Sequence, residues 1–243
     1  MTIVIDRFLS IADVNRAQQA LRKLAQHDIS RWALTGRFAI EYHCSRHGLE
    51  TRERELNDID FVASDFEHIP ATLASDYLFR HVHPFDPPAK TLVQFVDVDC
   101  ALRLDVFRTT AGVMRRAEVA GLGFGRIAIV ALEDMAARSA RLAMSLSEGK
   151  PVAPKHVTDY RRLVEIADPL KMERAWQDHR RTFDPESFEE TRVLLRHLIP
   201  ARSDLQVPVI YSRDMTAICP RCHPAPPFQM AEAGAVLSVL GYC

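Results

Sequence analysis

Three aspartates stand out as residues whose type and spacing could support chemistry. Asp58 and Asp60 lie in the run 57–62, and Asp105 lies in a second run of alternating apolar and polar residues, 102–107. Because side chains alternate between the two faces of a β-strand, Asp58 and Asp60 would share one face. Carboxylates on one face repel each other unless a cation lies between them. If the two strands are neighbours, all three carboxylates converge on one spot.

This convergence predicts a site for a hard divalent cation. Mg²⁺, or Mn²⁺ in its place, prefers carboxylate and phosphate oxygens as ligands. Two such ions about 3.5–4 Å apart can activate a hydroxyl and stabilise the leaving oxygens of a phosphoryl transfer. Asp97 and Asp99 form a rival acidic pair. Their position between two predicted strands favours a solvated turn instead.

The order of these motifs resembles a known superfamily. Gly36, then Asp58-Ile59-Asp60, then Leu104-Asp105-Val106 is similar to the pattern of the polymerase-beta-like nucleotidyltransferases, and most closely to their AbiEii-type toxin branch. That pattern is a strand, a Gly-Gly-Ser/Thr turn opening a helix, an Asp-x-Asp strand and a third acidic residue on a later strand. The resemblance covers roughly residues 20–168.

The resemblance is incomplete at the turn before the helix. Gly36 matches the first family glycine, whereas Arg37 replaces the second glycine and Phe38 replaces the hydroxyl residue. The resemblance implies that Gly36 lets the backbone approach the phosphates of a nucleotide. Arg37 could bind phosphate oxygens in place of the missing hydroxyl, or it could obstruct the site by pairing with Asp58 or Asp60 instead of metal.

Two cationic residues further along extend the resemblance. Arg138 follows Leu132-Glu133-Asp134-Met135, at a position where the family usually carries Lys. Lys155 opens 155–160, which is similar to the family's Lys-Asp-x-x-Asp-Leu. The resemblance implies that Arg138 and Lys155, together with Gly36 and Arg37, bind the nucleotide. Without the resemblance, Arg138 and Lys155 are interpreted as ordinary surface charges of helices.

Predicted elements around the aspartates form a mixed sheet flanked by helices. An amphipathic helix is expected over 12–27, since its apolar residues fall on one stripe. A strand at 32–34 leads through a turn into a helix from Phe38, and 91–96 with 101–108 reads as an antiparallel hairpin. The glycine-rich stretch 121–125 lacks the Lys-Ser/Thr of a phosphate-binding loop and is interpreted as a turn.

After residue 132 the pattern becomes helical. Helices are expected over 133–147, 156–167, 170–182 and 185–198, the last with Asp184 as its cap and Pro185 at its first position. The sequence therefore predicts an α+β protein with three parts. They are a nucleotidyltransferase-like domain over residues 1–131, a helical domain over 132–200 and a Pro/Cys-rich tail over 201–243.

Composition limits the classes of partner and the compartment. The chain has 243 residues, with 31 Lys and Arg against 32 Asp and Glu, so no basic excess points to nucleic acid. The first residues lack the apolar region of a signal peptide, and no run of about 18 apolar residues predicts a membrane span. An odd count of 5 cysteines without a secretion signal favours reduced thiols and a cytoplasmic protein.

The tail carries a possible second metal site. Cys219 and Cys222, in Cys-Pro-Arg-Cys-His, have the spacing of a zinc knuckle. A closed zinc site needs four ligands, which His223 and Cys243 could complete. Free thiols are the alternative, because no second pair with this spacing follows.

Together the residues and the resemblance predict a metal-dependent nucleotidyltransferase. It would move a nucleoside monophosphate from a nucleoside triphosphate to an acceptor hydroxyl, with RNA or protein as leading acceptors, a small molecule as another, and a cognate antitoxin as a possible partner. Asp58, Asp60 and Asp105 would be catalytic and bind the metal. The alternatives are a nucleotidyltransferase-like module that has lost turnover and a zinc-bearing nucleic-acid binder.

Overall fold

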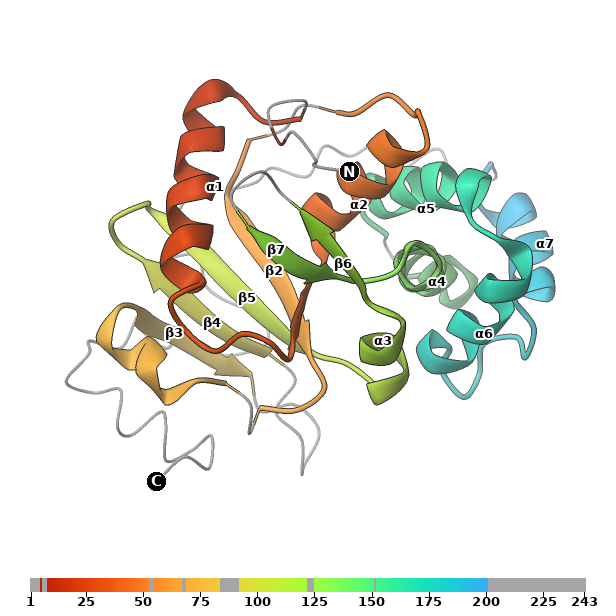
Figure 1. Ribbon diagram of the computed structural model, residues 1–243. Coiled ribbons are helices and arrows are strands. Elements are labelled where there is room, and N and C mark those ends of the chain that lie inside the picture. Colours follow the sequence, from red (N-terminus) through yellow and green to blue (C-terminus); the bar gives the residue numbers. More distant parts are fainter. Residues whose placement is uncertain are drawn as a thin grey trace. The chain divides into compact units, whose positions relative to one another are not determined.

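A computed structural model describes residues 5, 8–52, 55–66, 69–83, 92–121, 125–150 and 152–200 (Figure 1). These residues fall into two compact units. The first contains the chain up to Phe38 and the segment Arg52–Ile129, and the second contains Ala39–Thr51 and the described chain from Val130 onward. The domain limits drawn from the sequence remain a prediction, and the Pro/Cys-rich tail lies outside the described residues.

A seven-stranded mixed sheet organises the first unit (Figure 1). Its strands follow the order β3-β4-β5-β2-β1-β7-β6. β2 pairs with β5, and β1 with β7, in parallel, whereas the other neighbours are antiparallel. The strands are β1 Trp32–Leu34, β2 Asp58–Ala63, β3 Leu78–His83, β4 Leu92–Asp97, β5 Leu102–Arg108, β6 Glu118–Gly121 and β7 Arg126–Ile129.

Helix α1, Ile11–Leu24, is held against the strands of this unit. It begins after Ser10, whose hydroxyl accepts the backbone N–H of Asp13 and so satisfies one free donor of the first turn. Its apolar stripe is buried, and Arg16 donates to the backbone carbonyls of Leu56 and Cys100. These bonds fix the helix to the start of β2 and to the turn before β5.

Alternation along the central strands separates an apolar face from a polar one. In β2 the side chains of Ile59 and Phe61 are fully buried, as are those of Leu104 and Val106 in β5. Burying four large apolar side chains on one face contributes roughly 1.5–3 kcal/mol each. The residues between them must therefore point to the opposite face of the sheet.

Helices make up the second unit. They are α4 Leu132–Ala143, the short 3₁₀ helix η3 Met144–Glu148, α5 Pro154–Ile166, α6 Pro169–His179 and α7 Phe188–Leu198, with most of α2 Gly36–Arg46. The first unit also holds the short helices η2 Ala71–Ser75 and α3 Ala111–Arg116. In the part of the chain that is described, no helix has the length and apolar character needed to cross a bilayer.

The α+β class predicted from the sequence is confirmed, as are the hairpin of β4 and β5 and the four helices after residue 132. The cap predicted for the last helix is wrong. α7 begins after Ser187, which forms a reciprocal capping box with Glu190. Asp184 instead accepts hydrogen bonds from Arg181, so its carboxylate serves the preceding loop.

Candidate metal and nucleotide site

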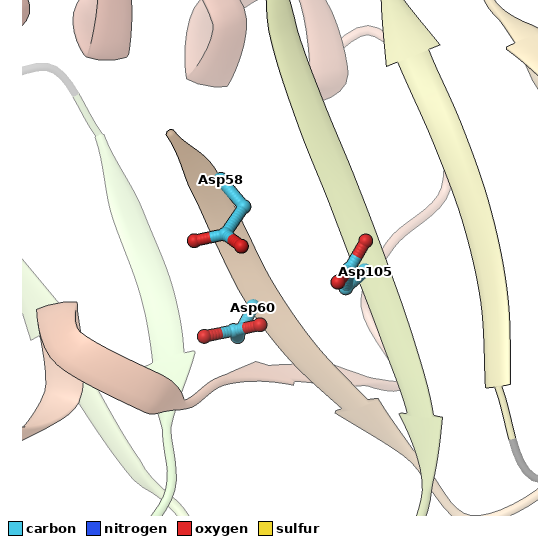
Figure 2. Close-up of side chains that lie close together, drawn as sticks. All are labelled: Asp58, Asp60 and Asp105. Carbon is cyan, nitrogen blue, oxygen red and sulfur yellow. The ribbon is translucent and has the colours of Figure 1, made fainter. Parts of the chain in front are cut away.

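The three aspartates meet on the polar face of the sheet because β2 and β5 are adjacent and parallel. Asp60 lies directly beside Asp105 in register, and Asp58 lies beside Arg103. One carboxylate oxygen from each aspartate can be chosen so that all three lie within 4.8 Å of one another. Figure 2 shows Asp58 and Asp60 projecting from β2 and Asp105 projecting from β5. The structure therefore brings together the residues that the sequence placed on two separate strands.

Burial is unequal across the three carboxylates. Asp105 is buried, whereas Asp58 and Asp60 are half-buried. Desolvation by burial raises the pKa of Asp105 to about 6, and the nearby negative charge of Asp58 adds to this effect, while Arg103 opposes it. An ionised Asp105 consequently favours cationic neighbours.

Arg103 supplies such a neighbour from the same strand. Its Nη2 lies 2.5 Å from Asp58 Oδ2 and its Nε lies 2.8 Å from Asp105 Oδ1. Burial lowers the pKa of Arg103, but the charges of Asp105 and Asp58 outweigh burial, so the net pKa is raised. The guanidinium thus stays charged and bridges two of the three candidate metal ligands.

Gln94 fixes the buried carboxylate from the other side. It lies beside Asp105 in the β4–β5 register, and its side-chain amide donates to Asp105 Oδ1 at 3.0 Å. The sequence-based prediction included neither Arg103 nor Gln94 as site residues. Arg103 could have been found, because it precedes Asp105 by two residues and therefore shares its face of the strand.

Gly36 adjoins the cluster through Asp60. Its φ of +62° lies in the left-handed region, and a Cβ at this position would lie 2.0 Å from Asp60 Oδ2. The backbone N–H of Thr35 also donates to the carbonyl of Asp60 at 2.9 Å. The glycine at the start of α2 therefore lets an acidic side chain lie against the backbone.

Arg37 is held by backbone carbonyls. Its guanidinium donates to the carbonyls of Phe8 at 2.7 Å, Glu55 at 3.0 Å and Arg52 at 3.1 Å. These bonds tie the start of α2 to the segment before β2. Neither a role in phosphate binding nor a role in obstructing the site is needed to explain this geometry, and nucleotide binding by Arg37 remains a prediction.

The other two predicted nucleotide ligands belong to the second unit. Arg138 lies on α4 and Lys155 lies in the first turn of α5, and both side chains are half-buried. Burial lowers the pKa of His156 in this unit, and the positive charges of Lys155 and Arg138 add to this effect. Their contact with a nucleotide remains a prediction.

The rival acidic pair, Asp97 and Asp99, has a structural role in the turn between β4 and β5. Asp97 is fully buried rather than solvated, and its Oδ1 accepts the backbone N–H groups of Asp99 and Cys100. Lys23 bridges Asp97 and Asp99 at 3.2 and 2.8 Å. Asp97 therefore closes a turn.

The donor set of the cluster fits a hard divalent cation. All three candidate ligands are carboxylates, which Mg²⁺ and Mn²⁺ accept, and no sulfur or nitrogen ligand from the described residues belongs to this group. The possible zinc ligands Cys219 and Cys222 lie outside the described residues. The cysteines among the described residues, Cys44 and Cys100, are both buried.

No protein-family model matches the sequence. A search of curated proteins likewise finds no match.

Three solved structures resemble the fold at low identity. A solution structure of the antibiotic-resistance factor ANT(2'')-Ia aligns with a TM-score of 0.42 and 13% identity, over 79% of this chain and 97% of that one. A crystal structure of the lincomycin-bound lincosamide antibiotic adenylyltransferase LnuA aligns with a TM-score of 0.39 and 12% identity, over 66% of this chain and 99% of that one. A crystal structure of an antigenic nucleotidyltransferase-like protein from Paracoccidioides brasiliensis aligns with a TM-score of 0.41 and 15% identity, over 84% of this chain and 93% of that one. At this level of similarity, function has to be inferred from the site residues.

Proposed function

We propose that this protein is a metal-dependent nucleotidyltransferase that moves a nucleoside monophosphate from a nucleoside triphosphate to an acceptor hydroxyl. The observation that carries the proposal is the convergence of Asp58, Asp60 and Asp105 on adjacent parallel strands. The packing of Gly36 against Asp60 supports it, because that contact joins the glycine turn to the carboxylate cluster. The order of these residues also resembles the polymerase-beta-like superfamily.

Each carboxylate has a role in this proposal. Asp58 and Asp60 would hold the divalent cations and, through them, the triphosphate. Asp105 would bind the metal at the acceptor side and help to deprotonate the attacking hydroxyl. Mg²⁺ or Mn²⁺, when bound, would neutralise the charge that develops on the attacking and leaving oxygens.

Nucleotide binding is proposed for the start of α2 and for three cationic side chains. The first N–H groups of α2, which begins at Gly36, would face phosphate oxygens and favour their charge. Arg37, Arg138 and Lys155 would supply positive charge to the transferred group. The acceptor proposed from the family resemblance is RNA or protein, with a small molecule as a further option, and the same resemblance proposes a cytoplasmic toxin controlled by an antitoxin.

A labelling experiment tests this function. Radiolabelled nucleoside triphosphates are incubated with the protein, Mg²⁺ or Mn²⁺, total RNA and cell lysate, and the labelled acceptor and released pyrophosphate are measured. Asp58→Asn, Asp60→Asn and Asp105→Asn should each abolish transfer, because each removes a ligand that the other two cannot replace. Asp99→Asn is the matched control, since the Asp99 side chain is 62% exposed and lies in the turn between β4 and β5, outside the cluster. Wild-type transfer activity in Asp60→Asn would refute the proposed function.

A second candidate is a nucleotidyltransferase-like binding module without turnover. The ion pairs of Arg103 with Asp58 and Asp105 favour it, because they already neutralise two of the carboxylates. Thermal stabilisation by a triphosphate with no release of pyrophosphate, in the presence of every acceptor fraction, would support the module over the enzyme.

A further inference from the structure

We infer, on the basis of the proposed metal-dependent transfer, that Arg103 is an internal counter-cation that competes with the divalent metal for the carboxylate cluster. It would lower the affinity of the cluster for a free divalent cation and would leave when phosphate oxygens enter with the metal. Arg103 would then set the conditions under which the site binds metal.

The position of Arg103 in the sheet explains why it reaches the cluster. It shares the polar face of β5 with Asp105, and its Cα lies opposite that of Asp58 on β2. The fork of the guanidinium matches this placement, because Nε bonds one carboxylate and Nη2 bonds the other. One side chain therefore spans the two strands that carry all three candidate metal ligands.

A divalent cation at the cluster would share two carboxylates with the guanidinium. The oxygens that Arg103 binds, Asp58 Oδ2 and Asp105 Oδ1, belong to the carboxylates whose oxygens would coordinate the metal. Two cations held by the half-buried Asp58 and the buried Asp105 also repel each other, and water screens them poorly there. We therefore infer that binding of a free cation weakens or breaks the two charge-assisted hydrogen bonds of Arg103, which lowers the affinity of the cluster for that cation.

Displacement of Arg103 leaves the remaining cluster in place. Gln94 also donates to Asp105 Oδ1, so the buried carboxylate keeps one partner when Arg103 moves. The Arg103 side chain is 26% exposed, and it can therefore turn toward solvent without crossing the core. A metal that arrives with a triphosphate would bring phosphate oxygens to which the guanidinium fork is well matched.

Calorimetric titration with Mn²⁺ alone tests this competition. Arg103→Met should bind Mn²⁺ at least about tenfold more tightly than the wild-type protein, a difference of about 1.4 kcal/mol. Arg108→Met is the matched control, because Arg108 is an exposed arginine at the end of the same strand. Its affinity for Mn²⁺ should stay within about twofold of wild type. Adding Asp60→Asn to Arg103→Met should abolish the gained binding, which would place the ion at the cluster.

Metal-free stability gives a second readout. Without Arg103 the ionised carboxylates lose their counter-charge, so in chelator Arg103→Met should melt at a lower temperature than Arg108→Met. Added Mn²⁺ should raise the melting temperature of Arg103→Met and so reduce this difference. Arg103→Gln, which is neutral but polar, gives the same comparison if the methionine variant fails to fold.

The possible outcomes separate this inference from the proposed function. If wild type and Arg103→Met bind Mn²⁺ with equal affinity, and Asp60→Asn abolishes binding in both, Arg103 does not compete with the metal. The proposed metal site would then still be supported. No Mn²⁺ binding by wild type or by either folded Arg103 variant would overturn both the inference and the metal site of the proposed function.

Discussion

The carboxylate of Asp60 fills the space in which any residue other than glycine at position 36 would carry its Cβ. That atom would lie 2.0 Å from Asp60 Oδ2 and 2.8 Å from Asp60 Cβ, distances far inside van der Waals contact. The positive φ of Gly36 adds a conformational reason for glycine. The identity of this residue is therefore tied to the position of a candidate metal ligand.

Gly36→Ala should lower the free energy of unfolding by more than the cost of placing an alanine at a positive φ. Gly48→Ala is a matched control, because Gly48 has a φ of +75° but no atom of the described chain within 4 Å of its Cβ position. The control should lose roughly 1–2 kcal/mol in the free energy of unfolding, the cost of a left-handed alanine. Gly36→Ala should lose more, since Asp60 or the turn must also move.

Denaturant unfolding of both variants measures this difference. Mn²⁺ titration should also show weaker binding in Gly36→Ala than in Gly48→Ala, because the displaced carboxylate is a candidate ligand. Equal losses of stability in the two variants would show that Asp60 relaxes at no cost, and would separate Gly36 from the cluster.

The sequence predicts this fold best where one face of an element is buried. Residues 58–61 and 102–106 alternate between polar and apolar types, so the pattern of residue types alone assigns their apolar and acidic faces. The sequence did not indicate β6 or α3, which the structure places after β5. β6 has only four residues and α3 only six, so neither carries enough of a periodic pattern to be recognised.

The convergence of the three aspartates was predicted, but their contacts with other side chains were not. Asp58, Asp60 and Asp105 meet as expected because β2 and β5 are neighbours in the sheet. Their cationic partner was not predicted, although Arg103 precedes Asp105 by two residues and therefore shares its face of β5. Only the register of β2 against β5 brings Arg103 onto Asp58, whereas Arg37 bonds backbone carbonyls.

The zinc prediction for the tail can be tested by metal content. If Cys219 and Cys222 bind zinc, purified protein should contain it in near-stoichiometric amount, and Cys219→Ala should remove it. Cys44→Ala is the control, because Cys44 is buried on α2 and lies outside the Cys219–Cys222 motif. Absence of zinc in elemental analysis, with both tail thiols reacting under native conditions, would leave them as free cysteines.

His156 should make the second unit less stable in mild acid. Burial lowers its pKa to about 4, with further effects from the positive charges of Lys155 on α5 and of Arg138 and Arg141 on α4. The folded state therefore prefers neutral His156, whereas the unfolded chain takes up a proton near pH 6.5. Stability should fall as the pH drops from about 6.5 toward 4, by about 1–2 kcal/mol at pH 5 relative to pH 8.

Denaturant unfolding of wild type and His156→Gln at pH 8 and pH 5 measures this contribution. The variant should lose less stability between the two pH values, by the amount that His156 contributes. His197→Gln controls for a general effect of removing a histidine, since His197 lies in the last turn of α7. An identical pH dependence in wild type and His156→Gln would show that His156 protonates freely in the folded protein.

The second unit contains a buried ion pair whose removal should be costly. Arg162 on α5 donates to both oxygens of Glu41 on α2, at 2.8 and 2.9 Å, and the two side chains are only 10% and 1% exposed. Arg162→Met leaves the Glu41 carboxylate buried without its counter-ion, so the free energy of unfolding should fall by about 3–5 kcal/mol.

A matched surface pair shows whether burial is the cause. Arg192 and Glu189 on α7 make the same two-bonded contact at 2.8 Å, but their side chains are 44% and 62% exposed. Arg192→Met should therefore cost no more than about 1 kcal/mol. The double change Arg162→Met with Glu41→Met should recover part of the lost stability, because no charge is then left unpaired in the core. If the double variant is as unstable as the sum of its single changes, the loss comes from packing and not from an uncompensated carboxylate.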